Sequence, residues 1–238
     1  MRVMAFASQK GGSGKTTLAG HVAVQAERAG AGPVALIDTD PQGSLSDWWN
    51  SREADTPYFA QTFISRLNDD IERMRAMGIA LLIFDTPPAI TATIEQVVRL
   101  CDLVVIPTRP SPHDLRAVGA TVDLCEKLDA PLVFVLNGAT QRARITAEAA
   151  IALSQAGTVA PVTIHHRTEF ASSMIDGRTV MEISCNPRSV EEIEELWEYI
   201  ADRLARSGRR ADVPEESAKA AGGNRAFEYL SRATSKGF

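Results

Sequence analysis

The sequence predicts an α/β fold in which helices cover both faces of a doubly wound, mostly parallel sheet. Short, continuous apolar runs at 34–37, 79–84 and 103–107 are typical of strands buried on both faces, and segments with helical spacing separate them. Two of these runs end directly in an aspartate, at Asp38 and Asp85. Because ligands of such sheets lie at the carboxyl ends of the strands, we expect both carboxylates near one site.

The 238 residues are enough for one such domain, which we place at 1–206, followed by a flexible tail at 207–238 that could end in a short helix. The tail is rich in Ala, Gly, Glu, Arg and Ser, a composition that does not favour a packed core. The chain is 45% hydrophobic and 23% charged, and no apolar run approaches the roughly 20 residues that span a bilayer. Without a signal-peptide pattern, we expect a cytoplasmic protein.

The first predicted strand, 2–7, runs into the glycine-rich stretch 8–17, and a helical pattern begins at Leu18. Glycines allow a tight turn in which backbone N–H groups and the positive end of the helix dipole converge on a phosphate. Lys15 can then reach the outer phosphates, and the Thr16 hydroxyl is placed to ligate a bridging Mg²⁺. This strand, turn and helix predict a cradle for nucleotide phosphates.

The stretch departs from the general phosphate-loop motif, because Gln9 stands where the first glycine is expected and Lys10 precedes the glycine pair. Lys-Gly-Gly-x-Gly-Lys-Thr-Thr resembles the deviant Walker A box of the ParA/MinD family of partitioning and positioning ATPases, closest to the small ParA-type proteins. The resemblance implies a P-loop NTPase in which Lys10 reaches across a dimer interface and takes part in catalysis with Lys15. The implied nucleotide contacts are Lys10, Gly11, Gly12, Ser13, Gly14, Lys15, Thr16 and Thr17.

The second strand, 34–37, ends in Asp38-Thr39-Asp40. Two carboxylates separated by one residue on an extended segment point the same way, so at the carboxyl end of a strand both can face a magnesium phosphate. A polar turn is the alternative interpretation. Together with the following Pro-Gln, the stretch resembles the family's second motif. That resemblance implies that Asp40 organises the attacking water and that Asp38 lies near the metal.

A short helix at 44–50 and an amphipathic helix at 64–77 precede the strand at 79–84, which ends in Asp85. A hydrophobic strand that ends in aspartate is a Walker B arrangement, in which the carboxylate holds Mg²⁺, usually through a water. Alone this signal is weak, but it follows the other two motifs in the expected order. The predicted metal ligands are Thr16, Asp38 and Asp85.

The strand at 103–107 leads into the proline-rich segment 108–114, which starts a helix that ends near Leu128. This segment resembles the part of the family that lines the dimer face and the nucleotide. His113 and Asp114 could suggest a catalytic pair. Because they are adjacent at a helix start, N-terminal capping is the favoured role.

The strand predicted at 132–136 ends at Asn137-Gly138. An amide at the carboxyl end of a strand offers a donor and an acceptor to an adenine edge, whereas Asn-Gly also favours a turn. In the MinD-like branch an asparagine at this place reads the base, so the resemblance implies nucleotide binding by Asn137. The remaining predicted elements are helices at 91–100 and 144–155 and a strand at 159–164.

The last predicted helix begins at a capping box, Ser189-Val190-Glu191-Glu192. Apolar residues then recur every three or four positions, which places them on one face of the helix. We expect this face to pack against the body of the protein. Its residues are Ile193, Leu196, Trp197, Ile200 and Leu204.

A net charge of -5 argues against a chain that coats nucleic acid through its overall charge, so any contact with DNA must be regional. Arginines recur in the carboxyl-terminal third, and dimerisation would double any patch that they form. Arg203 and Arg206 lie at the edge and on the polar face of the last predicted helix, free to meet phosphate. Solvated surface arginines are the alternative. The predicted DNA-binding residues are Arg167, Arg178, Arg203 and Arg206.

Cys101, Cys125 and Cys185 are scattered and lack ligand spacing, which favours small buried thiols over a disulfide or zinc framework. Nitrogenase-type iron proteins share the deviant phosphate loop but hold an iron–sulfur cluster between subunits with cysteines. The cysteines here do not reproduce that arrangement. A reductase or metal-pump ATPase that shares only the loop is therefore disfavoured.

The resemblance implies an ATPase that uses ATP and Mg²⁺, forms a homodimer in the ATP state, and binds duplex DNA of the nucleoid without sequence preference. A ParB-like or other adaptor would stimulate slow hydrolysis and release, so that DNA or another large cargo is partitioned or positioned. A MinD-like division regulator at the membrane is the alternative. The candidate terminal helix at 226–233 is short, with few basic residues beside it, so we expect no stable membrane association.

Overall fold

The computed structural model describes residues 1–89, 92–183 and 186–210. Over these residues the chain forms a seven-stranded sheet with the order β3-β2-β4-β1-β5-β6-β7. Every neighbouring pair of strands is parallel. The strands are β1 (Arg2–Phe6), β2 (Val34–Asp38), β3 (Tyr58–Phe59), β4 (Leu81–Asp85), β5 (Leu103–Thr108), β6 (Leu132–Ala139) and β7 (Val159–His165).

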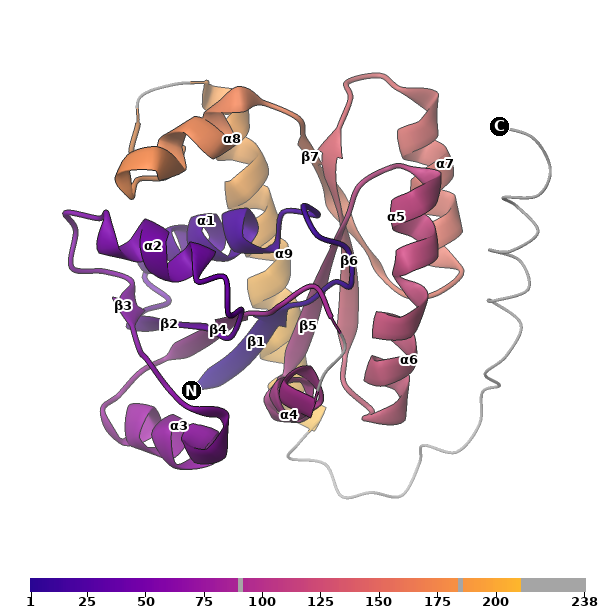
Figure 1. Ribbon diagram of the computed structural model, residues 1–238. Helices are drawn as coiled ribbons and strands as arrows, with labels where there is room; N and C mark the ends of the chain where they lie inside the picture. The colour runs from indigo at the N-terminus through magenta and orange to yellow at the C-terminus, as the bar shows by residue number, and fades with distance from the viewer. Residues whose placement is uncertain (90–91, 184–185, 211–238) are drawn as a thin grey trace.

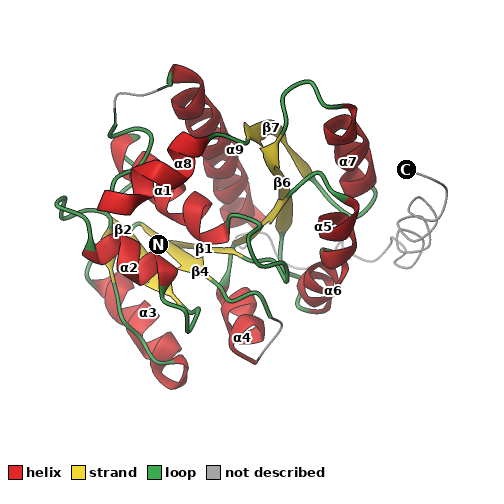
Figure 2. Cartoon of the chain, turned by 45° about the horizontal axis from the view of Figure 1, so that its top comes forward, coloured by secondary structure: helices red, strands yellow, loops and turns green. Residues whose placement is uncertain are grey.

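Helices lie on both faces of this sheet, as Figures 1 and 2 show, which confirms the predicted doubly wound fold. Two short 3₁₀ turns, η1 (Ile64–Arg66) and η2 (Ser173–Asp176), precede α3 and follow α8. The α-helices are α1 (Lys15–Arg28), α2 (Ser44–Asn50), α3 (Leu67–Ala76), α4 (Ala92–Leu100), α5 (Pro112–Ala117), α6 (Gly119–Lys127), α7 (Arg144–Ser154), α8 (Thr168–Ser172) and α9 (Pro187–Arg210).

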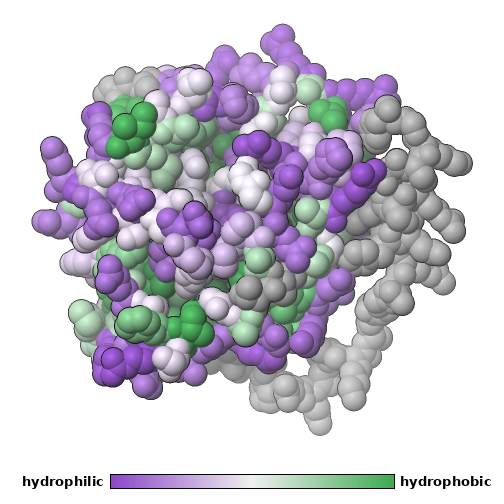
Figure 3. Space-filling view, in the orientation of Figure 1, coloured by the Kyte–Doolittle hydropathy of each residue, from purple (hydrophilic) through white to green (hydrophobic). Residues whose placement is uncertain are grey.

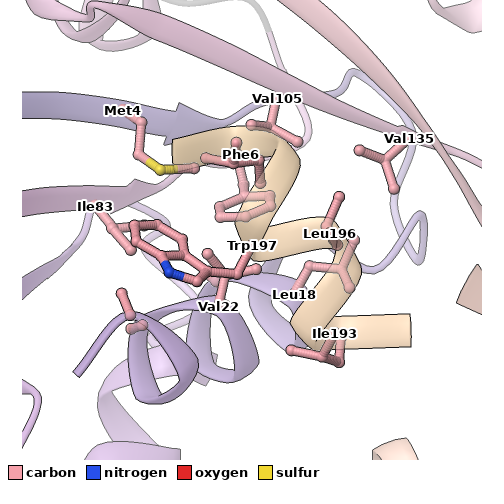
Figure 4. Packing of buried hydrophobic residues seen from close by; sticks show 14 of the residues in the cluster. Met4, Phe6, Leu18, Val22, Ile83, Val105, Val135, Ile193, Leu196 and Trp197 are labelled. Carbon is pink, nitrogen blue, oxygen red and sulfur yellow. The ribbon is translucent and has the colours of Figure 1, made fainter. Parts of the chain in front are cut away.

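Side chains of the central strand β1 point alternately to the two faces of the sheet and so belong to two different apolar cores. Met4 and Phe6 belong to the cluster that β1 shares with α1 and α9, whereas Val3 and Ala5 belong to the cluster on the opposite face. In Figure 4, Phe6 lies among side chains of α1 and α9. Full burial of one large apolar side chain stabilises the fold by roughly 1.5–3 kcal/mol. The predicted stripe of α9 is confirmed, since Ile193, Leu196, Trp197, Ile200 and Leu204 are all buried.

The predicted capping box at the start of α9 is wrong. The helix begins at Pro187, before Ser189, and the Asn186 side chain accepts the Arg188 N–H at 3.1 Å. The Ser189 hydroxyl is buried without a partner among the described residues. Glu192 does not reach back to the Ser189 N–H, because its carboxylate pairs with His165, the last residue of β7, and with Arg167, which lies just after that strand. The helix also continues past residue 206, to Arg210.

Two other elements differ from expectation. The single helix expected up to Leu128 is two helices, α5 and α6, with only Val118 between them. The strand expected to end at residue 136 continues to Ala139, so Asn137 and Gly138 lie in β6 and not in a turn. Gly138 has a φ of 65°, and the pairing of β6 with β7 is shifted between Asn137 and Ala139. A glycine in the left-handed region makes this irregularity possible.

The register of the sheet determines where the aspartates meet. β2, β4 and β1 are neighbours, Asp38 is the Cα partner of Asp85, and Asp85 is also the partner of Phe6. The segments that follow these strands therefore leave the same edge of the sheet at the same level. Three motifs that are distant in the sequence converge there.

The two edges of the sheet differ in length. β3 consists of only two residues, which pair with Ala35 and Leu36 of β2. β7 is longer and contains the exposed Pro161, which has no backbone N–H.

The face in Figure 3 is mainly hydrophilic, with apolar side chains gathered in its lower left part. The exposed large apolar residues include Phe63, which directly precedes η1. No helix within the described ranges is both long and apolar enough to cross a membrane.

The thiols that the structure describes fit the prediction of structural cysteines. Cys125 is fully buried and Cys101 packs against the same apolar cluster. Burial raises the pKa of Cys125 to about 12, so its thiol stays protonated. Cys185 lies outside the described residues.

Candidate functional site

The site is built on the loop that joins β1 to α1. Gly12 and Gly14 have φ angles of 74° and 98°, in the left-handed region that favours glycine. Gly14 is required for a second reason, because a Cβ atom there would lie 2.1 Å from the amide nitrogen of Asn137. A Cβ at Gly11 would meet nothing within 4 Å. The loop is therefore a tight turn that is open at Gly11 and Gly12 and is packed against Asn137 of β6 at Gly14.

The amino end of α1 faces this loop without a competing side chain. Gly14 is the N-cap, no side chain caps the first turn, and the first turn contains no acidic residue. The first intrahelical bond is donated by the Leu18 N–H to the Gly14 carbonyl at 2.9 Å. The earlier N–H groups of this helix of 14 residues are thus available to an anion, which the helix dipole also favours.

The two lysines of the loop lie in different surroundings. Lys15 is only 6% exposed, and its Nζ donates to the Lys10 carbonyl at 3.4 Å. Burial lowers the pKa of Lys15, while the negative charges of Asp85 and Asp40 partly oppose that shift. Lys10 is exposed and forms no ion pair with any residue that the structure describes. Lys15 is thus a buried cation of the cradle, and Lys10 is an exposed cation at its rim.

Asp85 and Thr16 form the floor of the site. The Thr16 hydroxyl donates to Asp85 Oδ2 at 2.5 Å, and Asp85 is 1% exposed. Its Oδ1 is buried and has no hydrogen-bond partner among the described residues. Burial raises the pKa of Asp85 to about 7, although the bond from Thr16 and the charge of Lys15 lower it. An unpartnered carboxylate oxygen beside a hydroxyl is a fitting pair of ligands for a hard cation.

Both carboxylate oxygens of Asp38 accept hydrogen bonds from backbone N–H groups. Oδ1 accepts from Asp40 at 2.9 Å, and Oδ2 accepts from Leu45 at 3.0 Å and Ser46 at 3.1 Å. Partial burial raises the pKa of Asp38, and these three bonds oppose the shift. The side chain lies beside the predicted metal site but is already engaged in holding its own loop.

Asp40 lies on the loop that Asp38 holds. One of its oxygens accepts the Gln42 N–H at 3.0 Å, and its carbonyl accepts the Gly43 N–H at 2.9 Å. Its charge influences both Lys15 and Asp85, so the structure brings the carboxylate into the electrostatic range of the cradle. Asp40 therefore lies close enough to Lys15 and Asp85 for its charge to act on both.

Asn137 is brought to the site, but through a contact that the sequence did not reveal. Its amide nitrogen donates to the Ser13 carbonyl at 2.6 Å, so it links β6 to the phosphate loop. Ser13 itself is buried, and its hydroxyl has no partner among the residues described. Base reading by Asn137 stays a prediction.

The predicted DNA-binding arginines do not form one patch. Arg167 is removed from the predicted set, because it makes two bonds of 2.6 and 2.7 Å to Glu192 and its side chain is 9% exposed. It lies just after the carboxyl end of β7, whereas Arg203 donates to the carbonyl of Leu132 at 3.5 Å, at the amino end of β6.

The other two predicted arginines are exposed but paired with neighbouring carboxylates. Arg178 pairs with Asp176 at 2.6 Å, and Arg206 pairs with Asp202 at 2.8 Å. Such exposed pairs are weak, so a phosphate can compete for the guanidinium group. Arg178, Arg203 and Arg206 stay available as candidates at two separate places.

The start of α5 is capped as expected, but Ser111 is the N-cap and, of the two predicted residues, Asp114 takes part in the cap. The Ser111 hydroxyl accepts the Asp114 N–H at 3.2 Å and donates to Asp114 Oδ2 at 2.5 Å. Asp114 is 7% exposed and faces Ser111 instead of pairing with His113. This loop at the carboxyl end of β5 is therefore fixed by its own side chains.

Two residues that support the site were not predicted. Thr39 donates to the Asp85 carbonyl through its N–H at 2.9 Å and its hydroxyl at 2.8 Å, which ties the second motif to the third. His21 of α1 is fully buried, and its Nδ1 donates to the Thr17 carbonyl at 2.7 Å. The sequence signal for His21 was its place as a polar residue on the apolar face of the predicted helix. Thr39 gave no signal beyond its place between two aspartates.

The sequence matches a known family of nucleotide-binding domains. Residues 4–180 match the model of the CobQ/CobB/MinD/ParA nucleotide binding domain. The chain is 30% identical, over 207 residues, to the "Maintenance of carboxysome distribution protein A" of Halothiobacillus neapolitanus, a match that covers 81% of this chain and 93% of that relative.

Two solved structures share the fold at low sequence identity. The cell division ATPase MinD of Pyrococcus furiosus superposes with a TM-score of 0.70 at 17% identity, covering 84% of this chain and 98% of that one. A putative plasmid partition protein of Borrelia burgdorferi bound to AMPPNP superposes with a TM-score of 0.67 at 17% identity, covering 85% and 99%.

Proposed function

Because this chain belongs to the family of the CobQ/CobB/MinD/ParA nucleotide binding domain, we propose that it is an ATPase that dimerises with ATP and positions DNA or another large cargo. The observation that carries the proposal is the convergence of the three motifs at the carboxyl ends of β1, β2 and β4. There the buried Lys15 and Asp85 and the half-buried Thr16 form a polar cluster at the amino end of a long helix.

The residues at this site fit ATP with Mg²⁺. The open turn and the free N–H groups of α1 suit phosphates, and the buried charge of Lys15 suits their outer oxygens. Thr16 and the unpartnered Oδ1 of Asp85 would hold the metal jointly with the phosphates, and bound Mg²⁺ would neutralise the charge that develops on them. The AMPPNP complex of the structurally similar Borrelia burgdorferi protein supports an adenine nucleotide as ligand.

Hydrolysis at such a site requires positioning more than covalent chemistry. We assign the orientation of the attacking water to Asp40, whose carboxylate lies in the field of Lys15. Lys10 is exposed at the rim and unpaired within the described ranges, so it is free to meet a nucleotide bound by a second copy. Two copies that face each other would each contribute Lys10 to the partner's phosphates.

The relatives indicate the kind of cargo. One is named for the distribution of carboxysomes, and a structural neighbour is a putative plasmid partition protein. We propose that this chain acts in the same way on a large intracellular assembly or a DNA molecule. Non-specific DNA binding by the ATP dimer would place it on the nucleoid in the cytoplasm. A ParB-like or other adaptor on the cargo would stimulate hydrolysis.

The proposal is tested by three substitutions in the full chain. Lys15→Ala should weaken ATP binding about tenfold or more, because it removes the buried charge from the phosphates. Lys10→Ala should bind ATP normally but stay monomeric, and Asp40→Ala should bind ATP, hydrolyse it slowly and accumulate as a dimer. Nucleotide binding, light scattering and phosphate release measure these three properties.

Each result has a contrary outcome. An ATP-dependent dimer of Lys10→Ala would remove the cross-interface role, and normal turnover by Asp40→Ala would move the water-orienting role elsewhere. An unchanged ATP affinity in Lys15→Ala would contradict the site itself. Binding of the ATP dimer to liposomes instead of DNA would favour the membrane-associated alternative.

A further inference from the structure

The carboxylate of Asp38 makes its three hydrogen bonds to backbone groups of one short stretch of chain. Two of these groups, the N–H groups of Leu45 and Ser46, belong to the second and third residues of α2. The third, the Asp40 N–H, belongs to the loop that leads there. Asp38 is the last residue of β2, so one side chain joins the strand, the loop and the helix.

Helix α2 has no cap of its own. Its N-cap is Gly43, in a left-handed conformation with a φ of 67°, and Gly43 has no side chain that could accept a hydrogen bond. An N-cap side chain normally accepts from the second or third residue of the helix. Asp38, at the end of β2, accepts the hydrogen bonds of these two helix positions in place of an N-cap side chain. Its negative charge at the amino end of the helix is also favourable.

The arrangement differs from that of Asp85, although both carboxylates end neighbouring strands in register. Asp85 keeps one oxygen buried without a partner among the described residues, whereas both oxygens of Asp38 accept N–H bonds of 3.1 Å or less. N–H groups occupy three of about four acceptor positions of the Asp38 carboxylate, whereas the described residues occupy none on Asp85 Oδ1.

We propose that Asp38 is a positioning residue that holds the Asp40 loop and the start of α2, and that it is not a metal ligand. This rests on the proposed ATPase function, in which Asp40 orients water. The loop is held from both sides, because Asp38 fixes the Asp40 N–H and the carbonyl of Asp85 accepts two bonds from Thr39. The bonds that Asp38 and Thr39 make therefore fix the backbone at Asp40.

Asp38→Asn tests this role with little change in size. The amide keeps one acceptor oxygen and places an NH₂ group either against the Asp40 N–H or against those of Leu45 and Ser46. We expect kcat to fall about tenfold, because the loop loses part of its support. The KM for ATP and the Mg²⁺ concentration for half-maximal activity should stay within about twofold, since Lys15, Thr16 and Asp85 are unchanged.

A double-mutant cycle separates positioning from metal binding. If Asp38 acts through Asp40, the double variant Asp38→Asn, Asp40→Ala should have the kcat of Asp40→Ala alone. The matched control is Asp47→Asn, which removes the same charge from an exposed residue in the first turn of α2 and should leave kcat unchanged. A requirement for severalfold more Mg²⁺ in Asp38→Asn, or a further loss of kcat in the double variant, would overturn the proposal.

A second measurement does not depend on activity. Amide hydrogen exchange at Asp40, Leu45 and Ser46 should become severalfold faster in Asp38→Asn than in wild type and in Asp47→Asn, without nucleotide present. Unchanged exchange would contradict the positioning role even if kcat fell. If the wild type lacked ATPase activity, the proposed function would fail while this exchange test still decided what Asp38 does.

Discussion

Gly14 carries two constraints at once, and each can be measured. Its φ of 98° is costly for any other residue, and a Cβ would lie 2.1 Å from the Asn137 amide nitrogen. Gly14→Ala should therefore lower the free energy of unfolding by about 1–3 kcal/mol and weaken ATP binding. Chemical denaturation and a nucleotide titration measure the two effects.

Gly11→Ala is the matched control for this substitution. The same loop has open space at Gly11, and its φ is not positive. It should lose less than about 0.5 kcal/mol of stability. Equal losses for the two variants would contradict the backbone and steric constraints assigned to Gly14.

Individual residues also show how far the sequence could predict the site. Glycine spacing, Lys15 and the aspartates at strand ends have local signatures, so their convergence followed once parallel strands were expected. The bond from Asn137 to Ser13 and the pairing of Arg167 with Glu192 join segments that are distant in the sequence. No local pattern specifies such pairs, and the capping box failed because Glu192 had a stronger partner there.

At the scale of elements, α1 is tied to the segment before α9 through His21. Its Nδ1 donates to the Thr17 carbonyl, so Nε2 accepts the Val180 N–H at 3.3 Å. Burial lowers the pKa of His21 from 6.5 to about 4, although the bond to Thr17 and the charge of Glu182 oppose the shift. The helix that starts at the phosphate loop thus depends on a neutral imidazole.

This histidine predicts a pH dependence with a definite sign. Between pH 4 and 6.5 the unfolded state binds a proton at His21 and the folded state does not, so stability rises with pH in this window. The contribution is about 3 kcal/mol for a shift of this size. Asp85, whose pKa is raised to about 7, acts in the opposite direction over much of the same range.

The effect of His21 on stability is therefore measured as the difference in the free energy of unfolding between wild type and a His21 variant. Denaturation of wild type and His21→Gln should be compared from pH 4 to 7, because the contribution of Asp85 is common to both proteins. The stability difference should change in favour of wild type as pH rises to 6.5 and then level off. A difference that is independent of pH would show that His21 is not held neutral.

α2 is connected at both of its ends. Asp38 holds its first turn, and Arg52, just beyond its last turn, pairs with Glu182 at 2.7 Å and lies 5.0 Å from the centre of the Trp48 ring. The Arg52 side chain is 2% exposed, so this ion pair is well shielded from solvent. These contacts join the Asp40 loop, α2 and the segment around Glu182 in one continuous set of side-chain contacts.

For the whole molecule, the decisive test is whether the proposed ATP dimer binds DNA. Arg203 and Arg206 lie near the carboxyl end of α9, so a dimer would carry two copies of this pair. We expect the Asp40→Ala dimer to bind duplex DNA with an affinity that falls steeply with salt. Substituting both arginines by Ala should weaken binding about tenfold and flatten the salt dependence.

The control for this surface is Arg73→Ala. Like Arg206, Arg73 is exposed and paired with an acidic residue on its own helix, but it lies on α3. Its loss should leave DNA retention unchanged. If Arg73→Ala weakened binding as much as the α9 variant does, the effect would reflect net charge and not this location.

The edges of the sheet restrict how copies of this chain can associate. Adding a strand from another molecule requires a row of free backbone groups, which β3 with its two residues does not offer. On the opposite edge, Pro161 interrupts the donors of β7. Within the described residues, both edges of the sheet thus disfavour the open-ended addition of further copies, so the proposed ATP dimer would form without competition from edge-to-edge pairing.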